Sequence, residues 1–131
     1  MPSGCMFFSA KGSRYAISLT NYSAEKQVNI NSNTAQDSWQ HIVYRQNGST
    51  GEIYINGVLQ KSGTVSVLPS ALGATAFNYL ARASYAGDQY LKNSKYSDFR
   101  IYNSALTPTQ ITQLAANKLK LDTLIYKDMV D

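Results

Sequence analysis

The fold is decided by the stretch that begins Trp39-Gln-His-Ile-Val-Tyr-Arg45, whose aromatic and β-branched residues are typical of a β-strand. Asn47-Gly48 follows it as a strong tight-turn signal. A second strand pattern, Glu52-Ile-Tyr-Ile55, ends at another such signal, Asn56-Gly57, and Val58-Leu-Gln-Lys61 begins a third strand. Strands joined by turns this short pair antiparallel, so the sequence predicts a meander and excludes a parallel α/β sheet here.

Toward the N-terminus, two apolar stretches flank a polar turn. Cys5–Phe8 and Tyr15–Leu19 are separated by Lys11-Gly12-Ser13, which predicts a β-hairpin. Residues 20–37 are polar, and only Val28 and Ile30 alternate as a short strand would.

Toward the C-terminus, the sequence predicts two further strands and a helix. The strands are expected at Phe77–Arg82 and Tyr96–Tyr102. In the second strand the alternation places Ser97, Phe99 and Ile101 on one face. The other face carries Tyr96, Asp98, Arg100 and Tyr102. Thr107-Pro108 then supplies a helix start, and apolar spacing predicts one helix over about residues 108–117.

Composition limits the class of protein. A chain of 131 residues with 44% hydrophobic and 15% charged residues fits one β-rich globular domain. Its twelve basic residues are scattered and give a net charge of only +4, so nucleic acid is not an expected partner. Cys5 is the only cysteine, which rules out an intrachain disulfide. No stretch has the length of a membrane span and the first residues lack a signal-peptide pattern, so we expect no membrane partner and any secretion signal outside this chain.

Four blocks of sequence carry a family resemblance. In chain order they are Trp39–Val43, Gly51–Val58, Tyr79–Arg82 and Ser97–Leu106 followed by Thr107. Together they resemble the laminin-G-like, concanavalin-type jelly-roll modules attached to bacterial glycoside hydrolases. The last block is the most specific, because an aspartate-led strand ends in Tyr-Asn-x-Ala-Leu before a short helix. The resemblance implies an all-β antiparallel jelly-roll sandwich over residues 4–120.

The same resemblance implies a function. Residues 121–131, a terminal strand or linker, resemble the junction to the next domain in multimodular family 43 enzymes. The chain is then expected to be a non-catalytic carbohydrate-binding module of an arabinan- or xylan-degrading enzyme, secreted, periplasmic or on the cell surface as part of a larger protein. Its partners would be a polysaccharide or oligosaccharide and the parent protein's catalytic domain. The alternative is a structural or assembly module that packs against that domain and binds no sugar.

One departure from the family pattern affects the expected assembly. Complete modules of this kind have several strands before the region that matches Cys5, and the chain lacks them. Such a sandwich would leave sheet edges and core surface uncovered. The expectation is a fragment-like chain that forms a homodimer, either by edge pairing or by exchange of segments.

Catalysis is not expected, because the acidic residues have the wrong spacing. Retaining glycosidases need two carboxyl groups about 5 Å apart, often at i and i+2 on one strand. No such pair exists here, and the two glutamates, Glu25 and Glu52, lie in different segments. His41 has no nucleophile motif near it and is interpreted as structural. Trp39 could stack on a sugar ring, but the family resemblance implies that a core strand begins at this position, so Trp39 is expected to pack in the core.

The candidate ligand segment is residues 82–91. A loop here would combine two aromatic rings with planar polar groups, the combination that sugar sites use. The candidate carbohydrate-binding residues are Arg82, Tyr85, Asp88 and Tyr90, with Gln89 beside them. An ordinary polar loop anchored by tyrosine is the other interpretation.

Asp98 is the candidate metal ligand. The family resemblance implies that an acidic residue here can tie a structural calcium ion to the opening strands. Calcium takes six to eight oxygen ligands, so further ligands would have to come from elsewhere. The other interpretation is an interaction between Asp98 and Arg100.

Overall fold

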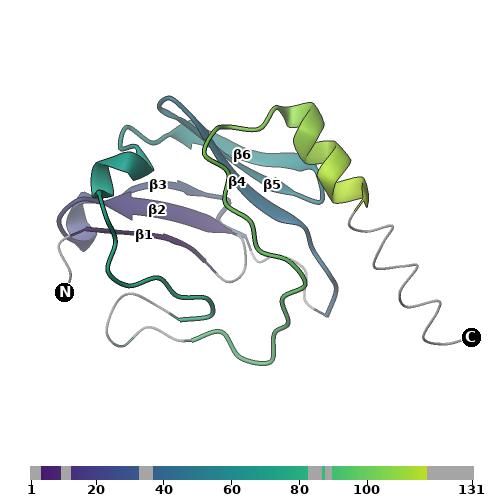
Figure 1. Cartoon of the computed structure of the whole chain (residues 1–131), viewed down its shortest axis with the longest axis horizontal. Coiled ribbons are helices and arrows are strands. Elements are labelled where there is room, and N and C mark those ends of the chain that lie inside the picture. The colour runs from purple at the N-terminus through teal and green to yellow at the C-terminus, as the bar shows by residue number, and fades with distance from the viewer. Residues whose placement is uncertain (1–3, 10–12, 33–36, 83–86, 88–89, 118–131) are drawn as a thin grey trace, which may run out of the picture.

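The computed structural model describes residues 4–9, 13–32, 37–82, 87 and 90–117. Within them lie six strands, two short 3-10 helices and one α-helix (Figure 1). In chain order they are β1 (Cys5–Phe8), β2 (Arg14–Ser18), η1 (Tyr22–Ala24), β3 (Lys26–Asn29), β4 (Ile42–Asn47), β5 (Thr50–Ile55), β6 (Val58–Thr64), η2 (Pro69–Leu72) and the helix over residues 108–117. None of the helices in these ranges is long and apolar enough to cross a membrane.

The strands form two antiparallel three-stranded sheets that lie one over the other (Figure 1). One sheet has the order β1-β2-β3 and the other β4-β5-β6. Tyr15 on the central strand of the first sheet is paired with Phe8 on one side and Val28 on the other. The N-terminal hairpin, the short strand near Val28 and the meander are therefore confirmed, and so is the all-β sandwich class.

The two turns of the meander depend on residues that tolerate positive φ. Asn56 and Gly57 have φ values of 51° and 81°, the pattern of a tight hairpin turn that matches strand twist. The side-chain oxygen of Asn56 also accepts a hydrogen bond of 2.9 Å from the backbone N–H of His41. Gly48 takes the first of the two positions between paired Asn47 and Thr50, with a φ of 57°.

The core lies between the two sheets. Its buried side chains are Tyr15, Ile17, Val28, Ile53 and Val65, with Phe8, Ile30, Tyr44, Val67 and Leu72 packed around them. The rings of Tyr15 and Tyr44 stack across the gap with centroids 3.5 Å apart and an interplanar angle of 10°. Gly51 of β5 has no space for a side chain, because a Cβ atom there would be 2.6 Å from the Tyr44 hydroxyl oxygen and 3.0 Å from Val28 Cγ2 on the facing sheet. The core is therefore built jointly by both sheets.

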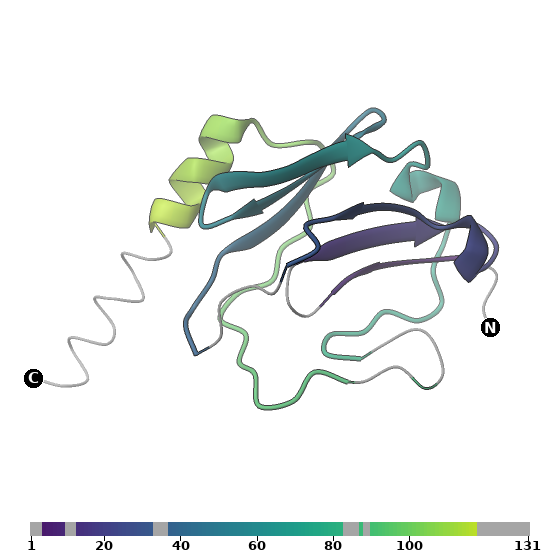
Figure 2. The same ribbon diagram turned by 180° about the vertical axis from the view of Figure 1, so that it is seen from behind.

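The helix over residues 108–117 begins with a capping box. The backbone N–H of Gln110 donates to Thr107 Oγ1 at 3.2 Å, and the backbone N–H of Thr107 donates to Gln110 Oε1 at 2.8 Å. The buried residues Ile111 and Ala115 recur at helical spacing, and Thr112 Oγ1 donates to the Gly57 carbonyl at 3.1 Å. The helix thus lies against the β5–β6 turn, on the side away from β1–β3 (Figure 2), and its predicted position is confirmed.

Two predicted strands are wrong. Residues 77–82 and 96–102 form no ladder with any described segment, and every residue from 96 to 102 is exposed. Ile101 alone is 80% exposed. Side-chain alternation favours an extended chain, but a strand also needs a neighbouring backbone, and the described part of the chain supplies none here.

Trp39 also differs from expectation. The predicted strand began at this residue, whereas β4 begins at Ile42, and the Trp39 ring is 49% exposed rather than part of the core. Trp39 comes before the first paired residue of β4, so strand pairing does not fix which face of the sheet its side chain occupies. Residues 121–131, expected to be a strand or linker, lie outside the described residues.

Candidate binding surface

The chain after η2 carries a group of exposed aromatic residues with one arginine among them. We call Phe77, Tyr79, Arg82 and Tyr90 the aromatic platform. The Phe77 and Tyr79 rings are nearly parallel, at 11°, with centroids 6.3 Å apart. Phe77 is 72% exposed, Tyr79 43% and Tyr90 54%, so their rings are open to solvent. An apolar ring surface of this kind is unusual on a free protein surface and is typical of a binding site.

Arg82 lies between two rings of the aromatic platform. Its guanidinium carbon is 4.3 Å from the Tyr79 ring centroid and 5.9 Å from that of Tyr90. Both distances are within the range of a cation–π contact. The contacts connect two parts of the chain that lie on either side of residues 83–89.

The local backbone explains why these residues meet. Ala81 adopts a left-handed conformation with a φ of 63°, which turns the chain sharply before Arg82. The N–H of Leu91 donates to the Ala81 carbonyl at 3.0 Å, so the returning chain brings Tyr90 beside Arg82. In both ribbon views residues 77–82 lie below β1, away from the sheet β4-β5-β6 (Figures 1 and 2).

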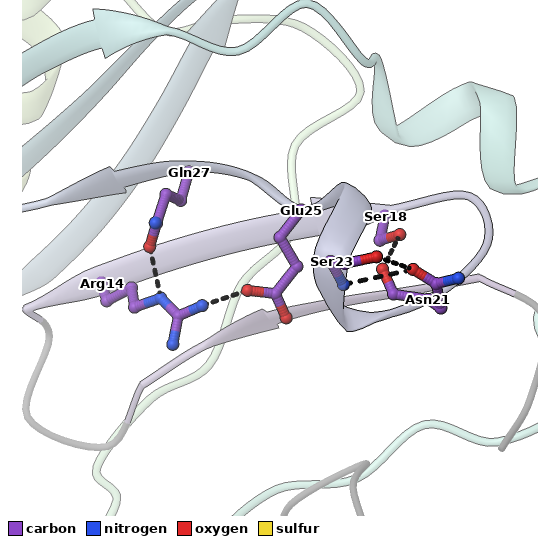
Figure 3. A network of polar contacts seen from close by, with 6 residues as sticks. All are labelled: Arg14, Ser18, Asn21, Ser23, Glu25 and Gln27. Atoms are coloured by element: carbon purple, nitrogen blue, oxygen red, sulfur yellow. Dashed lines mark hydrogen bonds and ion pairs between the residues drawn. The ribbon is translucent and has the colours of Figure 1, made fainter.

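The two glutamates are held by arginines on separate sheets. Glu25, whose side chain is only 5% exposed, pairs with Arg14 of β2, and Arg14 Nε donates to Gln27 Oε1 at 2.6 Å (Figure 3). Glu52 of β5 pairs with Arg45 of β4. Because each carboxylate has a fixed cationic partner in a different layer, the pair does not form the two-carboxylate arrangement of a glycosidase.

A second, shallower feature lies beside the helix. It is a hollow of about 290 Å³. Its lining residues are Tyr102, Leu106, Gln110, Gln113, Leu114 and Asn117. One aromatic ring and three side-chain amides could also contact a hydroxyl-rich ligand, although the volume is at the lower limit for ligand sites.

Residues 4–112 match the laminin G family described as the concanavalin A-like lectin/glucanases superfamily. The chain belongs to this superfamily. Among solved structures it is similar to an S-layer domain-containing protein from Clostridium thermocellum, with a TM-score of 0.56 and 24% identity. The alignment covers 88% of this chain and 64% of the solved chain, and it supports the fold alone. No curated protein matches the sequence.

In this concanavalin A-like chain the structure brings together two of the four predicted sugar-binding residues. Arg82 and Tyr90 meet through the cation–π contact, whereas Tyr85 and Asp88 lie outside the described residues. Sequence reasoning missed Phe77 and Tyr79, because it assigned them to a strand. The signal that could have found them is an aromatic alternation directly before Arg82, in a segment with no turn-linked partner strand.

The predicted metal ligand Asp98 forms an ion pair with Arg100, with a distance of 2.9 Å between Asp98 Oδ2 and Arg100 Nη2. Hydrogen bonds with Tyr102 and Asp98 raise the pKa of Arg100 above its usual value. Across the described ranges, His, Cys, Asp and Glu side chains nowhere gather in groups of three or more that could hold a metal. These residues alone do not fit a calcium site, so calcium at Asp98 stays a prediction that needs further ligands.

Proposed function

We propose that this chain is a non-catalytic carbohydrate-binding module and that the aromatic platform is its binding surface. The observation that carries the proposal is an open group of three aromatic rings, two of which contact Arg82, on a lectin-type fold. Fold membership alone would not support it, because one fold hosts many functions.

The chemistry of sugars matches this surface. A pyranose or furanose ring presents C–H groups on one face, and these pack on an aromatic ring as other apolar groups do. Its hydroxyl groups lie around the edge, where Arg82 can donate hydrogen bonds. Three rings spread along one segment suit a polymer better than a single sugar, because each ring can contact a different residue of the chain.

The biological setting that we propose is a polysaccharide-degrading enzyme of the arabinan or xylan type, with this chain as its accessory module. The sequence resemblance to modules of family 43 enzymes supports this setting. A secreted or cell-surface location follows from it, and the similar fold of an S-layer domain-containing protein agrees with that location.

Affinity gel electrophoresis with arabinan, xylan and β-glucan tests the binding proposal. We expect retardation in at least one gel, and Phe77→Ala, Tyr90→Ala and Tyr85→Ala should each weaken binding by roughly 1 to 3 kcal/mol, as for loss of a stacked aromatic contact. Tyr22→Ala is the matched control, because Tyr22 is 65% exposed but lies on η1. Equal retardation of wild type and all three of these variants would move the site elsewhere.

The hollow beside the helix is the alternative location within the same function. Gln113→Ala changes its lining without touching the aromatic platform. If this variant loses binding while Tyr90→Ala keeps it, the hollow and not the platform is the sugar site.

A second candidate function is a structural module that packs against a catalytic domain. Residues 96–102 favour it, because Phe99 and Ile101 are 59% and 80% exposed on an extended segment without a ladder. Such a module would bind the catalytic domain of its parent protein and be retarded by no glycan. Isothermal titration against that domain, beside the glycan gels, separates the two functions.

A further inference from the structure

We propose that the aromatic platform selects sugars that carry a carboxylate, that is, uronic acid residues in a polysaccharide. The inference rests on the proposed carbohydrate-binding function and specifies its ligand class. It is argued from a comparison of the groups that each arginine of the chain contacts.

Arg82 differs from the other arginines in what it contacts. The chain has four arginines, and three of them pair with a carboxylate. These pairs are Arg14 with Glu25, Arg45 with Glu52, and Arg100 with Asp98. Arg82 contacts aromatic rings instead, and no carboxylate within the described ranges forms an ion pair with it.

The ring contacts leave Arg82 suited to a carboxylate ligand. A guanidinium is planar, its five N–H donors lie in its plane, and it can give two parallel hydrogen bonds to one carboxylate. Contact with the rings of Tyr79 and Tyr90 restricts the side chain before the ligand arrives, so less conformational freedom is lost on binding. Arg82 therefore offers a held donor pair next to surfaces where a sugar ring can pack.

The sequence around the aromatic platform has a net positive charge, as Arg82 does. The described residues between 77 and 100 include four basic side chains, Arg82, Lys92, Lys95 and Arg100, against one acidic side chain, Asp98. Asp98 is already paired with Arg100. Asp88 also lies in this stretch of the sequence, so the local excess is two positive charges, half of the +4 of the whole chain, and it attracts an anionic polymer over a neutral one.

A uronic acid fits both halves of this surface at once. Its ring has the apolar face that stacks on Tyr79 or Tyr90, and its carboxylate projects from the ring edge toward donors such as those of Arg82. A simple anion would use Arg82 but leave the exposed rings uncovered, and a neutral sugar would use the rings but leave the guanidinium without its strongest kind of acceptor.

The experiment uses pairs of polymers that differ only in the carboxylate. Affinity gels and isothermal titration compare polygalacturonate, and glucuronate-substituted xylan, with the same polymers after reduction of their carboxyl groups to alcohols. We expect at least about tenfold tighter binding to the acidic forms, as for one charge-assisted bidentate contact, and loss of most of this preference at high salt.

Variants locate the effect. Arg82→Gln should abolish the preference, because it should weaken binding to the acidic polymers at least about tenfold more than binding to the reduced polymers. Arg82→Lys should keep only part of the preference, because an ammonium cannot make the bidentate contact. Lys61→Gln on β6 is the matched control for loss of one positive charge. It should keep the full preference.

The outcomes separate this inference from the proposed function. Equal binding to acidic and reduced polymers would overturn the inference and leave the carbohydrate-binding function standing. Binding to no polymer would overturn both. A carboxylate preference that survives in Arg82→Gln would show that another cation recognises the carboxylate, and the assignment to Arg82 would be wrong.

Discussion

At the scale of single residues, Gly51 shows how closely the two sheets approach. A Cβ atom there would lie 2.6 Å from the Tyr44 hydroxyl oxygen and 3.0 Å from Val28 Cγ2, closer than real atoms pack. Gly51 is not among the glycines with positive φ, so its backbone conformation does not require glycine. The lack of space for a Cβ atom is what requires glycine at this position.

Gly51→Ala should therefore destabilise the protein by about 1 to 3 kcal/mol through overpacking. Gly63→Ala on the neighbouring strand is the control, because its Cβ would meet only Val28 Cγ2 at an ordinary 3.5 Å. Urea unfolding measures both. Equal stability of the two variants would show that the side chains around Gly51 can make room for a methyl group without cost.

The stacked Tyr15 and Tyr44 give the core a predictable response to alkaline pH. Burial raises the pKa of Tyr15 to about 12 from an ordinary value of 10, and burial also raises the pKa of Tyr44. The folded state therefore favours the neutral phenols. Their contribution to stability is complete below pH 10 and is lost as the pH rises toward 12, because the unfolded chain ionises first.

Urea midpoints measured from neutral pH into this window should fall, with tyrosinate absorbance rising in step. Tyr15→Phe should flatten the fall, since phenylalanine does not ionise, at the cost of the weak bond from Tyr15 Oη to Met6 Sδ. A midpoint that is unaffected by pH between 10 and 12 in the wild type would contradict burial of these phenols.

At the scale of elements, the helix over residues 108–117 depends on its first turn. Thr107 and Gln110 satisfy each other's backbone N–H groups, which have no partner within the helix itself. Thr107→Ala should cost about 1 kcal/mol of stability. Thr109→Ala, which changes an exposed threonine inside the helix, is the control and should cost nothing. Equal melting temperatures of the two variants would show that the cap does not stabilise the protein.

The sequence could predict those elements whose conformation is specified by neighbouring residues in the chain. Asn56-Gly57 specifies its own turn through positive φ, and Thr107-Pro108 specifies its own helix start. Residues 77–82 and 96–102 have equally strand-like patterns, but a strand depends on a partner that no local pattern names. The same limit affected the site, because Phe77 and Tyr79 were assigned to a strand and so overlooked as ligand contacts.

The candidate binding residues that the sequence did predict had a different basis. Arg82 and Tyr90 were selected because aromatic and planar polar groups occur together in a short segment, and the turn at Ala81 does bring them together. The ring contacts of Arg82 could not be predicted, since they depend on a left-handed residue that is not glycine or asparagine.

At the scale of the whole molecule, the exposed segment 96–102 bears on assembly. A segment that forms no ladder with any described strand and exposes Phe99 and Ile101 offers a surface for contact with another chain. We predict a homodimer by edge pairing or exchange of segments, because two identical chains would cover this segment on both copies at once.

Light scattering after size exclusion, at several concentrations, should give a mass of twice the 14.5 kDa of the chain. Ile101→Lys should shift the protein toward monomer, whereas Val58→Lys, an exposed aliphatic residue on β6, should not. A well-folded wild-type monomer near 14.5 kDa at every concentration would show that no second copy covers this segment.

The central claim is that the aromatic platform is where this concanavalin A-like chain binds carbohydrate. A heteronuclear NMR titration of the labelled protein with oligosaccharides tests it most directly, because every backbone amide reports at once. We predict that the shifts concentrate on residues 77–82 and 90–92, including the guanidinium signal of Arg82. Shifts that concentrate instead on the hollow around Gln113 and Asn117, with the platform signals unchanged at saturation, would contradict the claim.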